Sequence, residues 1–203
     1  RSQGGAGSPR YLEVQSVRRV VAAEGGTLRI DTVYQAPRTY PLQRYADGRA
    51  GVGEEEFAVH FGYCFATQGA VVKVDPESGK LEVLRIVAAQ DAGRVLHRQN
   101  VIGQIEGGVM MGLGYALQEA YEVDEKGVGP GSFQKLGVMR IGDMPPVKSF
   151  IVEEPHPDGP HEAKGLGEIP LNPTAPAIAN AVANAVGYVP RALPIRIPPG
   201  WKS

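Results

Sequence analysis

The chain has 203 residues, of which 42% are hydrophobic and 21% charged, a composition typical of a domain that can bury a sizeable core. Its 21 basic and 22 acidic residues are interspersed and give a net charge of −1, so charge offers no argument for a nucleic-acid partner or a membrane surface. The single cysteine, Cys64, excludes an intrachain disulfide and an iron–sulfur or cysteine-rich zinc site made by this chain alone, and it favours a reducing, cytoplasmic location.

The opening residues 1–10 are rich in glycine and serine and predict a flexible lead-in to a domain over 11–203, in one or two subdomains. Because the first residue is arginine, we expect the sequence to begin inside a longer gene product or after processing. No run approaches the roughly 18 apolar residues of a membrane helix, and no secretion signal opens the chain. We therefore expect no membrane partner.

Two β-hairpins are predicted in the first half of the chain. The first joins 11–23 to 27–34, both rich in β-branched residues, across a Glu-Gly-Gly turn. Residues 36–56 lack periodicity and predict an exposed loop, and the aromatic-rich 57–64 predicts a strand. The second hairpin joins 69–75 to 80–88 across a turn at 76–79, and its alternating pattern predicts a sheet buried on one face and partly covered on the other.

A long helix is predicted over about 101–120, after a turn at 91–94. Apolar residues at helical spacing mark one buried face: Ile102, Ile105, Val109, Leu113 and Ala116. Glycines within this helix each cost on the order of 1 kcal/mol relative to alanine, and the helix has five: Gly103, Gly107, Gly108, Gly112 and Gly114. Close approach explains such a set, either by a neighbouring helix, which is the commoner case, or by a bulky ligand.

The second half predicts a strand over 121–133 that leads into a glycine loop, an ambiguous stretch at 134–142, and a strand over 148–153. A second helix is predicted over 173–186, with Asn172 as N-cap and Gly187 as the residue that ends it. The order of hairpins and helices predicts an α+β fold, with mixed sheets built from β-hairpins and two main helices packed on them.

One carboxylate, Glu168, lies in a glycine- and proline-rich segment directly ahead of the second helix. Gly165 and Gly167 allow backbone conformations closed to other residues and the close approach of a ligand, and Pro170 stiffens the chain after Glu168. The pattern alone leaves two interpretations open. Glu168 is either a carboxylate held out on a shaped turn or a solvated residue in a connection to a core helix.

Other candidate sites are weaker. Residues 112–117 resemble part of a dinucleotide-binding fingerprint but lie inside a predicted helix. A polar cluster precedes the Glu168 segment, but its spacing matches no standard zinc pattern: His156, Asp158, His161 and Glu162. No serine lies in a nucleophile-elbow sequence, and nothing in the sequence activates Cys64. We therefore expect no metal ion held by protein side chains alone.

The Glu168 segment resembles a known active site. Residues 164–171 (KGLGEIPL) and 175–181 (APAIANA) are similar to the C-terminal active-site segment of the molybdenum hydroxylases, the xanthine dehydrogenase and aldehyde oxidase family. Residues 91–120 are similar to the family stretch whose glutamine hydrogen-bonds the pterin, and that position is Gln104. With the hairpin before them, the resemblance covers roughly 57–188.

The resemblance implies the C-terminal portion of a molybdopterin-binding subunit, active only within a larger assembly. The enzyme would hydroxylate an N-heterocycle or an aldehyde with water as the oxygen source, and Glu168, in a desolvated pocket, would be the general base. The implied cofactor is molybdopterin, in its mononucleotide or its cytosine dinucleotide form, and the residues implied to bind it are Gln104, Gly103, Gly107, Lys164, Gly165 and Gly167.

The resemblance also implies partners. The N-terminal molybdopterin-binding half would come from a further domain or another subunit, as would the 2Fe–2S clusters and any FAD. Met111 stands where many family members have glutamine, and Ile169 where many have proline, which leaves the substrate open. The alternative functions are a non-catalytic structural or assembly subunit of the same fold and, more remotely, a sugar- or nucleotide-binding module.

Overall fold

A computed structural model describes residues 43–44, 50–51, 60 and 62–201, all of which lie in one compact unit of residues 36–203. The hairpin predicted over 11–34 lies outside the described residues. Within 36–56, predicted as a loop, β1 (Gln43–Arg44) and β2 (Ala50–Gly51) pair antiparallel. Strands of two residues are too short to leave an alternating pattern, which is why the sequence did not predict them.

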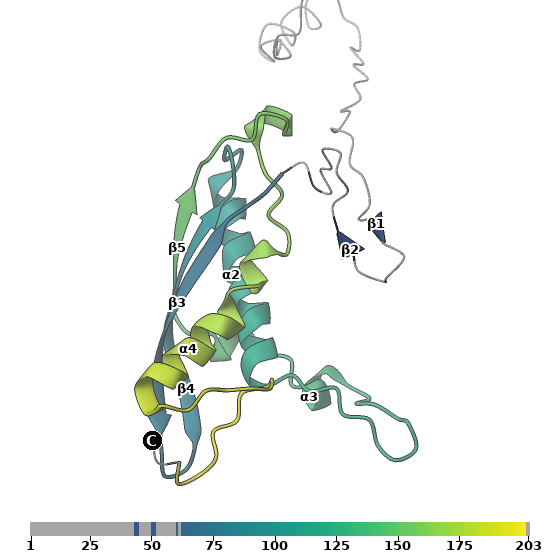
Figure 1. The fold of residues 1–203 in the computed structure, drawn as a ribbon, viewed down its shortest axis with the longest axis vertical. Coiled ribbons are helices and arrows are strands. Elements are labelled where there is room, and N and C mark those ends of the chain that lie inside the picture. The colour runs from purple at the N-terminus through teal and green to yellow at the C-terminus, as the bar shows by residue number, and fades with distance from the viewer. Residues whose placement is uncertain (1–42, 45–49, 52–59, 61, 202–203) are drawn as a thin grey trace, which may run out of the picture. The chain divides into compact units, whose positions relative to one another are not determined.

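A three-stranded mixed sheet, in the order β3-β4-β5, forms one layer of the domain (Figure 1). The predicted second hairpin is confirmed, because β3 (Ala66–Asp75) and β4 (Lys80–Asp91) pair antiparallel. The predicted third strand is confirmed as β5 (Val147–Val152), which runs parallel to β4. The sheet with its helices is the α+β arrangement that the sequence predicted.

Two helices cover one face of this sheet and lie side by side (Figure 1). Helix α2 (Arg98–Leu117) begins three residues before the predicted start, because the His97 imidazole accepts the Asn100 N–H at 3.1 Å and caps the helix. Helix α4 (Thr174–Val186) ends at Gly187 as predicted. The prediction that Asn172 is its N-cap is wrong: Pro173 holds that position.

The error at Asn172 has a local cause. A short 3₁₀ helix, η3 (Ile169–Leu171), precedes α4, and the Asn172 N–H donates to the carbonyl of Ile169. Asn172 is therefore already helical in its backbone, with φ −59° and ψ −44°, and cannot take the extended conformation of an N-cap.

The core lies between the sheet and the two helices. Its buried side chains come from β4, from both helices, from the connection between residues 136 and 141, and from the C-terminal segment: Ile86, Ala88, Ile105, Val109, Leu113, Ala116, Met139, Ile178, Val182, Ile195 and Ile197. The Ile195 N–H donates to the carbonyl of Ala116 and the Arg196 guanidinium to that of Leu117. The C-terminal segment thus satisfies carbonyls that the last turn of α2 leaves without a helical partner.

Two strand predictions are wrong. The described residues of 57–64 are not in a strand. Residues 121–133 also form no strand, since the Asp124 carboxylate accepts the N–H groups of Lys126 and Val128, and Gly127 closes the turn at φ +78°. Such local side-chain bonds compete with sheet pairing.

The stretch 134–142, left ambiguous by the sequence, contains most of a helical turn, α3 (Phe133–Leu136), and the start of a 3₁₀ helix, η1 (Ile141–Asp143). No helix among the described residues is long and apolar enough to cross a membrane.

Four of the five glycines of α2 fall on two faces, and the fifth, Gly114, is buried beside Glu119 and Met139. Gly108 and Gly112 are buried and lie against η3 and the start of α4. A methyl group at Gly108 would lie 2.7 Å from Pro170 Cβ and 3.1 Å from the Leu171 nitrogen, and one at Gly112 would overlap the Thr174 side chain. Gly103 and Gly107 are exposed, and a methyl group there would meet no atom within 4 Å. Helix packing therefore explains the first pair and leaves the second unexplained.

Adjacent glycines should respond oppositely to alanine. Gly107→Ala is expected to raise the free energy of unfolding of this chain by up to about 1 kcal/mol, because it removes the entropic cost of glycine and meets open space. Gly108→Ala is expected to lower it by about 1–3 kcal/mol, because the new methyl group presses on the rigid Pro170 ring and on backbone.

Denaturant unfolding of the two variants beside the parent chain measures the difference. Equal effects of the two substitutions would contradict the assignment of separate faces.

Candidate functional site

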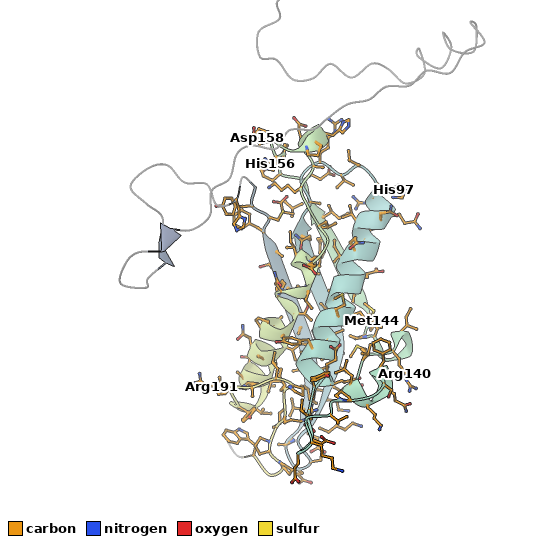
Figure 2. All side chains as sticks on the ribbon, turned by 90° about the vertical axis from the view of Figure 1, so that its right-hand side faces the viewer. His97, Arg140, Met144, His156, Asp158 and Arg191 are labelled. Atoms are coloured by element: carbon orange, nitrogen blue, oxygen red, sulfur yellow. The ribbon has the colours of Figure 1, made fainter. Side chains whose placement is uncertain are left out.

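The candidate site lies at the carboxyl ends of the parallel strands β4 and β5, where open α/β sheets commonly bind ligands. Two connections leave the sheet there, residues 92–97 to α2 and residues 153–168 to η3. Figure 2 shows His97, at the start of α2, at the same end of the domain as His156 and Asp158 from the second connection. Glu168 is the last residue of that connection.

A buried ion pair joins the end of β4 to the second connection. The Lys164 ammonium donates to Asp91 Oδ2 at 2.6 Å, and the two side chains are only 9% and 5% exposed. Asp91 Oδ1 also accepts the Gly93 N–H at 3.0 Å. Burial works to raise the pKa of Asp91, but the hydrogen bonds from Lys164 and Gly93 outweigh it and hold the pKa below its usual range. Asp91 is thus a buried carboxylate that stays ionised because it is paired.

Backbone hydrogen bonds extend this join. Gly93 and Ala163 form an antiparallel bridge, and the Lys164 N–H donates to the carbonyl of Ala92. The Arg94 N–H donates to the carbonyl of Glu162, and the side chains of these two residues form an exposed ion pair at 3.7 Å. The segment that precedes Glu168 is therefore fastened to the end of β4.

The segment after Glu168 is fastened to α2 and β3. Pro170 is fully buried against Gly108, and its carbonyl accepts the Gln68 amide N–H at 2.7 Å. The Thr174 hydroxyl donates to Oε1 of the Gln68 side-chain amide at 2.8 Å. A single half-buried glutamine of β3 thus holds both η3 and the first residue of α4.

Between these two attachments, Glu168 is exposed. Gly165 and Gly167 are also exposed, and a methyl group on either would meet no atom within 4 Å. Neither glycine has a positive φ, so the expectation that they adopt conformations closed to other residues is wrong in that respect. The open space beside them fits the second expectation, close approach by another group. The described residues do not supply the desolvated pocket expected around Glu168.

Cys64 lies against this segment. Its thiol donates to the carbonyl of Gly165 at 3.4 Å. Burial and the nearby Asp91 carboxylate raise the pKa of the thiol, which keeps it protonated and able to donate. Cys64 thus contributes a hydrogen bond to the loop, as expected for a cysteine that nothing activates.

The exposed face of α2 forms the other side of the candidate site, next to the segment that carries Glu168. Gln104 is exposed beside Gly103 and Gly107, and it lies one turn before Gly108, where Pro170 packs. Gln104 and Glu168 therefore flank the same contact between α2 and η3. Towards the end of α2, the same side of the helix borders an apolar groove of about 450 Å³ lined by Met111, Tyr115, Glu119, Leu171, Asn172, Ala175, Pro176 and Leu193.

The polar loop before the motif shows no cluster of metal ligands in the part of the chain that the structure describes. No group of three or more histidine, cysteine or acidic side chains among the described residues could hold a metal ion. His161 and Glu162 have left-handed backbones, with φ 54° and 63°, and the Glu162 carbonyl accepts the N–H groups of Arg94 and His156. These hydrogen bonds hold the loop in a fixed turn and fasten it to the residues that follow β4.

Sequence reasoning missed three residues that build the site: Asp91, Gln68 and Thr174. The sequence places Asp91 only in a turn, although an acidic residue at the end of a buried strand is a recognisable signal. Gln68 and Thr174 gave no local signal, because their bonds join residues 106 positions apart in the chain.

Comparison with known proteins identifies the family. Residues 6–145 match the model of the molybdopterin cofactor-binding domain. The chain belongs to this family. The match includes all of α2 with Gln104 and ends before the Glu168 segment.

Curated relatives agree with this assignment. The chain is 30% identical over 168 residues to a nicotinate dehydrogenase subunit of Pseudomonas putida, a match that covers 78% of this chain and 14% of the relative. It is 33% identical over 136 residues to a probable xanthine dehydrogenase subunit of Bacillus subtilis, covering 67% and 18%. The chain thus spans less than a fifth of the length of either relative.

Among solved structures, the aldehyde oxidoreductase of Desulfovibrio gigas matches with a TM-score of 0.57 and 33% sequence identity, over 63% of this chain and 14% of that one. Quinoline 2-oxidoreductase of Pseudomonas putida 86 matches with a TM-score of 0.57 and 26% identity, over 62% and 16%. The fold is therefore that of a domain found in molybdenum hydroxylases.

The buried ion pair makes the stability of the domain depend on pH. Asp91→Asn is expected to lower the free energy of unfolding at neutral pH by about 3 kcal/mol, because Lys164 loses its buried counter-charge. The folded-state pKa of Asp91 lies below its unfolded value of about 3.9, so its contribution is present above that pH and is lost as pH falls through the folded-state value.

Urea unfolding at pH 7 and below pH 4 should show a gap between parent and variant that narrows in acid. Arg94→Gln, which removes the neighbouring exposed pair, is the control and should change stability by less than about 1 kcal/mol. A gap that stays constant with pH would contradict this account.

Proposed function

We propose that this chain is the C-terminal molybdopterin-binding portion of a molybdenum hydroxylase that hydroxylates an N-heterocycle or an aldehyde, with water as the oxygen source. One observation carries the proposal. Exposed glycines with open space beside them occur on both sides of the α2–η3 contact, with Gln104 next to one set and Glu168 next to the other.

The residues present fit a pterin cofactor. Gly103 and Gly107 lie inside a helix, where each glycine costs on the order of 1 kcal/mol, and no packing in the described residues accounts for them. A flat ligand laid on the bare backbone of α2 would account for both. Gln104, on the same exposed surface, has a side-chain amide that can both donate to and accept from a pterin ring.

The second wall is the segment that carries Glu168. Lys164, Gly165 and Gly167 would hold the cofactor from this side, the two glycines by leaving their backbone groups accessible. The Lys164 ammonium is already paired with Asp91, so we assign its contribution to the placement of this backbone.

When bound, the molybdenum cofactor supplies oxygen transfer and accepts the electrons of the reaction. Glu168 supplies the proton chemistry. Its carboxylate would take a proton from the attacking oxygen as general base, since it is the one carboxylate on the segment between the two attachments. Because Glu168 is exposed in the described residues, water would be excluded by a further part of the assembled enzyme.

The relatives support a multi-part enzyme. The chain covers 14–18% of the two relatives described above, so the N-terminal half of the cofactor site would come from another domain or subunit. A 6-hydroxypseudooxynicotine dehydrogenase complex subunit from Paenarthrobacter nicotinovorans is a further relative, 36% identical over 117 residues. The names of the relatives support a heterocycle or aldehyde substrate. We assign any 2Fe–2S and FAD groups to partners and molybdopterin, in its mononucleotide or cytosine dinucleotide form, to the site shared with this chain.

The competing function is a structural or assembly subunit in which Glu168 is incidental. It does not account for Gly103 and Gly107, which would then destabilise the helix without any gain in binding. Co-purification tests it directly: a partner that carries the other half of the cofactor site, with hydroxylase activity, supports the enzyme, and a stable homomer without cofactor supports the scaffold.

Glu168→Gln in the assembled enzyme is expected to lower kcat by about 10²–10⁴-fold, because the amide cannot accept the proton. Molybdenum content should stay at the level of the parent enzyme, since the substitution preserves the shape of the segment. Steady-state kinetics normalised to bound molybdenum measures this. Turnover close to normal would remove Glu168 from the mechanism.

Gly107→Ala in the assembled enzyme is expected to reduce molybdenum content severalfold, because its methyl group would occupy the space assigned to the cofactor. Gln104→Ala should also reduce it. The readout is molybdenum per polypeptide by elemental analysis. Since Gly107→Ala is expected to stabilise the chain itself, a loss of molybdenum cannot be ascribed to unfolding, and full molybdenum retention in both variants would contradict the site.

A further inference from the structure

Residues 165–169 lie between two attachments, Lys164 at the end of β4 and Pro170 against α2 and β3. We propose that Asp91, through its buried ion pair with Lys164, sets the position of the Glu168 carboxylate and is a positioning residue for the reaction proposed above. This inference rests on the proposed role of Glu168.

The first attachment is at Lys164, four residues before Glu168. Its ammonium lies 2.6 Å from Asp91 Oδ2, and its backbone N–H donates to the carbonyl of Ala92. Asp91 in turn is the last residue of β4, and its second oxygen accepts the N–H of Gly93. The carboxylate therefore ties Lys164 to a strand in the centre of the sheet.

The second attachment is at Pro170, two residues after Glu168. Pro170 is fully buried against Gly108 of α2, and Gln68 of β3 donates to its carbonyl. The chain on that side is thus fixed by α2 and β3, independently of Asp91.

Three of the five residues in the linkage between these attachments are exposed, namely Gly165, Gly167 and Glu168, and Leu166 and Ile169 are half-buried. Gly165 and Gly167 have no side chains to pack and lie in open space. The thiol of Cys64 donates to the Gly165 carbonyl, but a thiol is a weak donor. A segment this short passes any shift of Lys164 on to Glu168, and a displacement of about 1 Å at a reacting group can lower the rate by about 10²-fold.

Burial makes the Asp91–Lys164 pair the more effective of the two ion pairs at this join. The Arg94–Glu162 pair lies at 3.7 Å, with side chains 62% and 52% exposed, so water screens it and both side chains keep much of their freedom. The Asp91–Lys164 pair is short and almost completely shielded from water. The structure therefore offers a matched control, an exposed pair that joins the same two connections.

The test uses the holoenzyme that contains this chain, with Asp91→Asn, Lys164→Met and the control Arg94→Gln. In the first two variants we expect kcat per bound molybdenum to fall by about 10–100-fold with KM within about threefold of the parent value. Because kcat is normalised to bound molybdenum, any loss of cofactor in these variants does not add to the expected fall, and Arg94→Gln should behave like the parent. A purely structural role would lower the melting temperature and leave kcat per molybdenum unchanged, which would overturn the inference.

Hydrogen exchange measured by mass spectrometry gives a readout that does not depend on turnover. The peptide that spans 164–171 should exchange about tenfold faster in Asp91→Asn than in the parent, because one attachment has been loosened. The peptide of α2 that contains Gly108 should be unchanged. Exchange of 164–171 at the parent rate would also overturn the inference.

A variant with one unpaired buried charge can fail to fold, and the double variant Asp91→Asn with Lys164→Gln addresses this by removing both charges. It should show the same loss of kcat per molybdenum. Glu168→Gln in the same preparation separates the two proposals. If it retains turnover, the proposed function fails; if it loses turnover while the double variant has a normal kcat per molybdenum, only the positioning role fails.

Discussion

The contact of Pro170 with the bare backbone at Gly108 sets the arrangement of this domain. It allows η3 to approach α2 more closely than any residue with a side chain at that position would permit, and Gly112 extends the same contact to Thr174 at the start of α4. Because α4 follows η3 directly, this one contact places the second helix on the sheet beside the first. Gln104 lies one turn of α2 before Gly108, and Glu168 lies two residues before Pro170, so the two residues flank this contact.

The charged side chains at the site differ in how far they are buried. Asp91 and Lys164 are held together out of contact with water, whereas Glu168, only four residues beyond Lys164 in the chain, is exposed. A buried carboxylate with a short-range partner serves to hold structure, and an exposed one beside open space remains available for chemistry. Under the proposed function, the two acidic residues take different roles because their surroundings differ, since both side chains are carboxylates.

Under the proposed function, this domain forms one side of a cofactor site. Its glycines leave open space on α2 and on the Glu168 segment, and the chain spans less than a fifth of the two relatives compared above. Packing satisfies the inner glycines of α2, so the outer ones need a partner that is not among the described residues. In the proposed enzyme, this domain would fold on its own core and cofactor binding would wait for the assembled protein.

The sequence by itself determined the local features. Alternation and a Pro-Glu-Ser-Gly turn predicted the β3–β4 hairpin, helical spacing predicted the buried face of α2, and the motif at 164–171 predicted Glu168 as the candidate carboxylate. These signals are local, because turn chemistry and periodicity act over a few residues. Where local chemistry was misjudged, as at Asp124 and Asn172, the prediction was wrong. Only the tertiary structure decided which glycines pack and which stay open, that Lys164 pairs with Asp91, and that Gln68 holds Pro170 and Thr174, because each of these depends on contacts between residues distant in sequence.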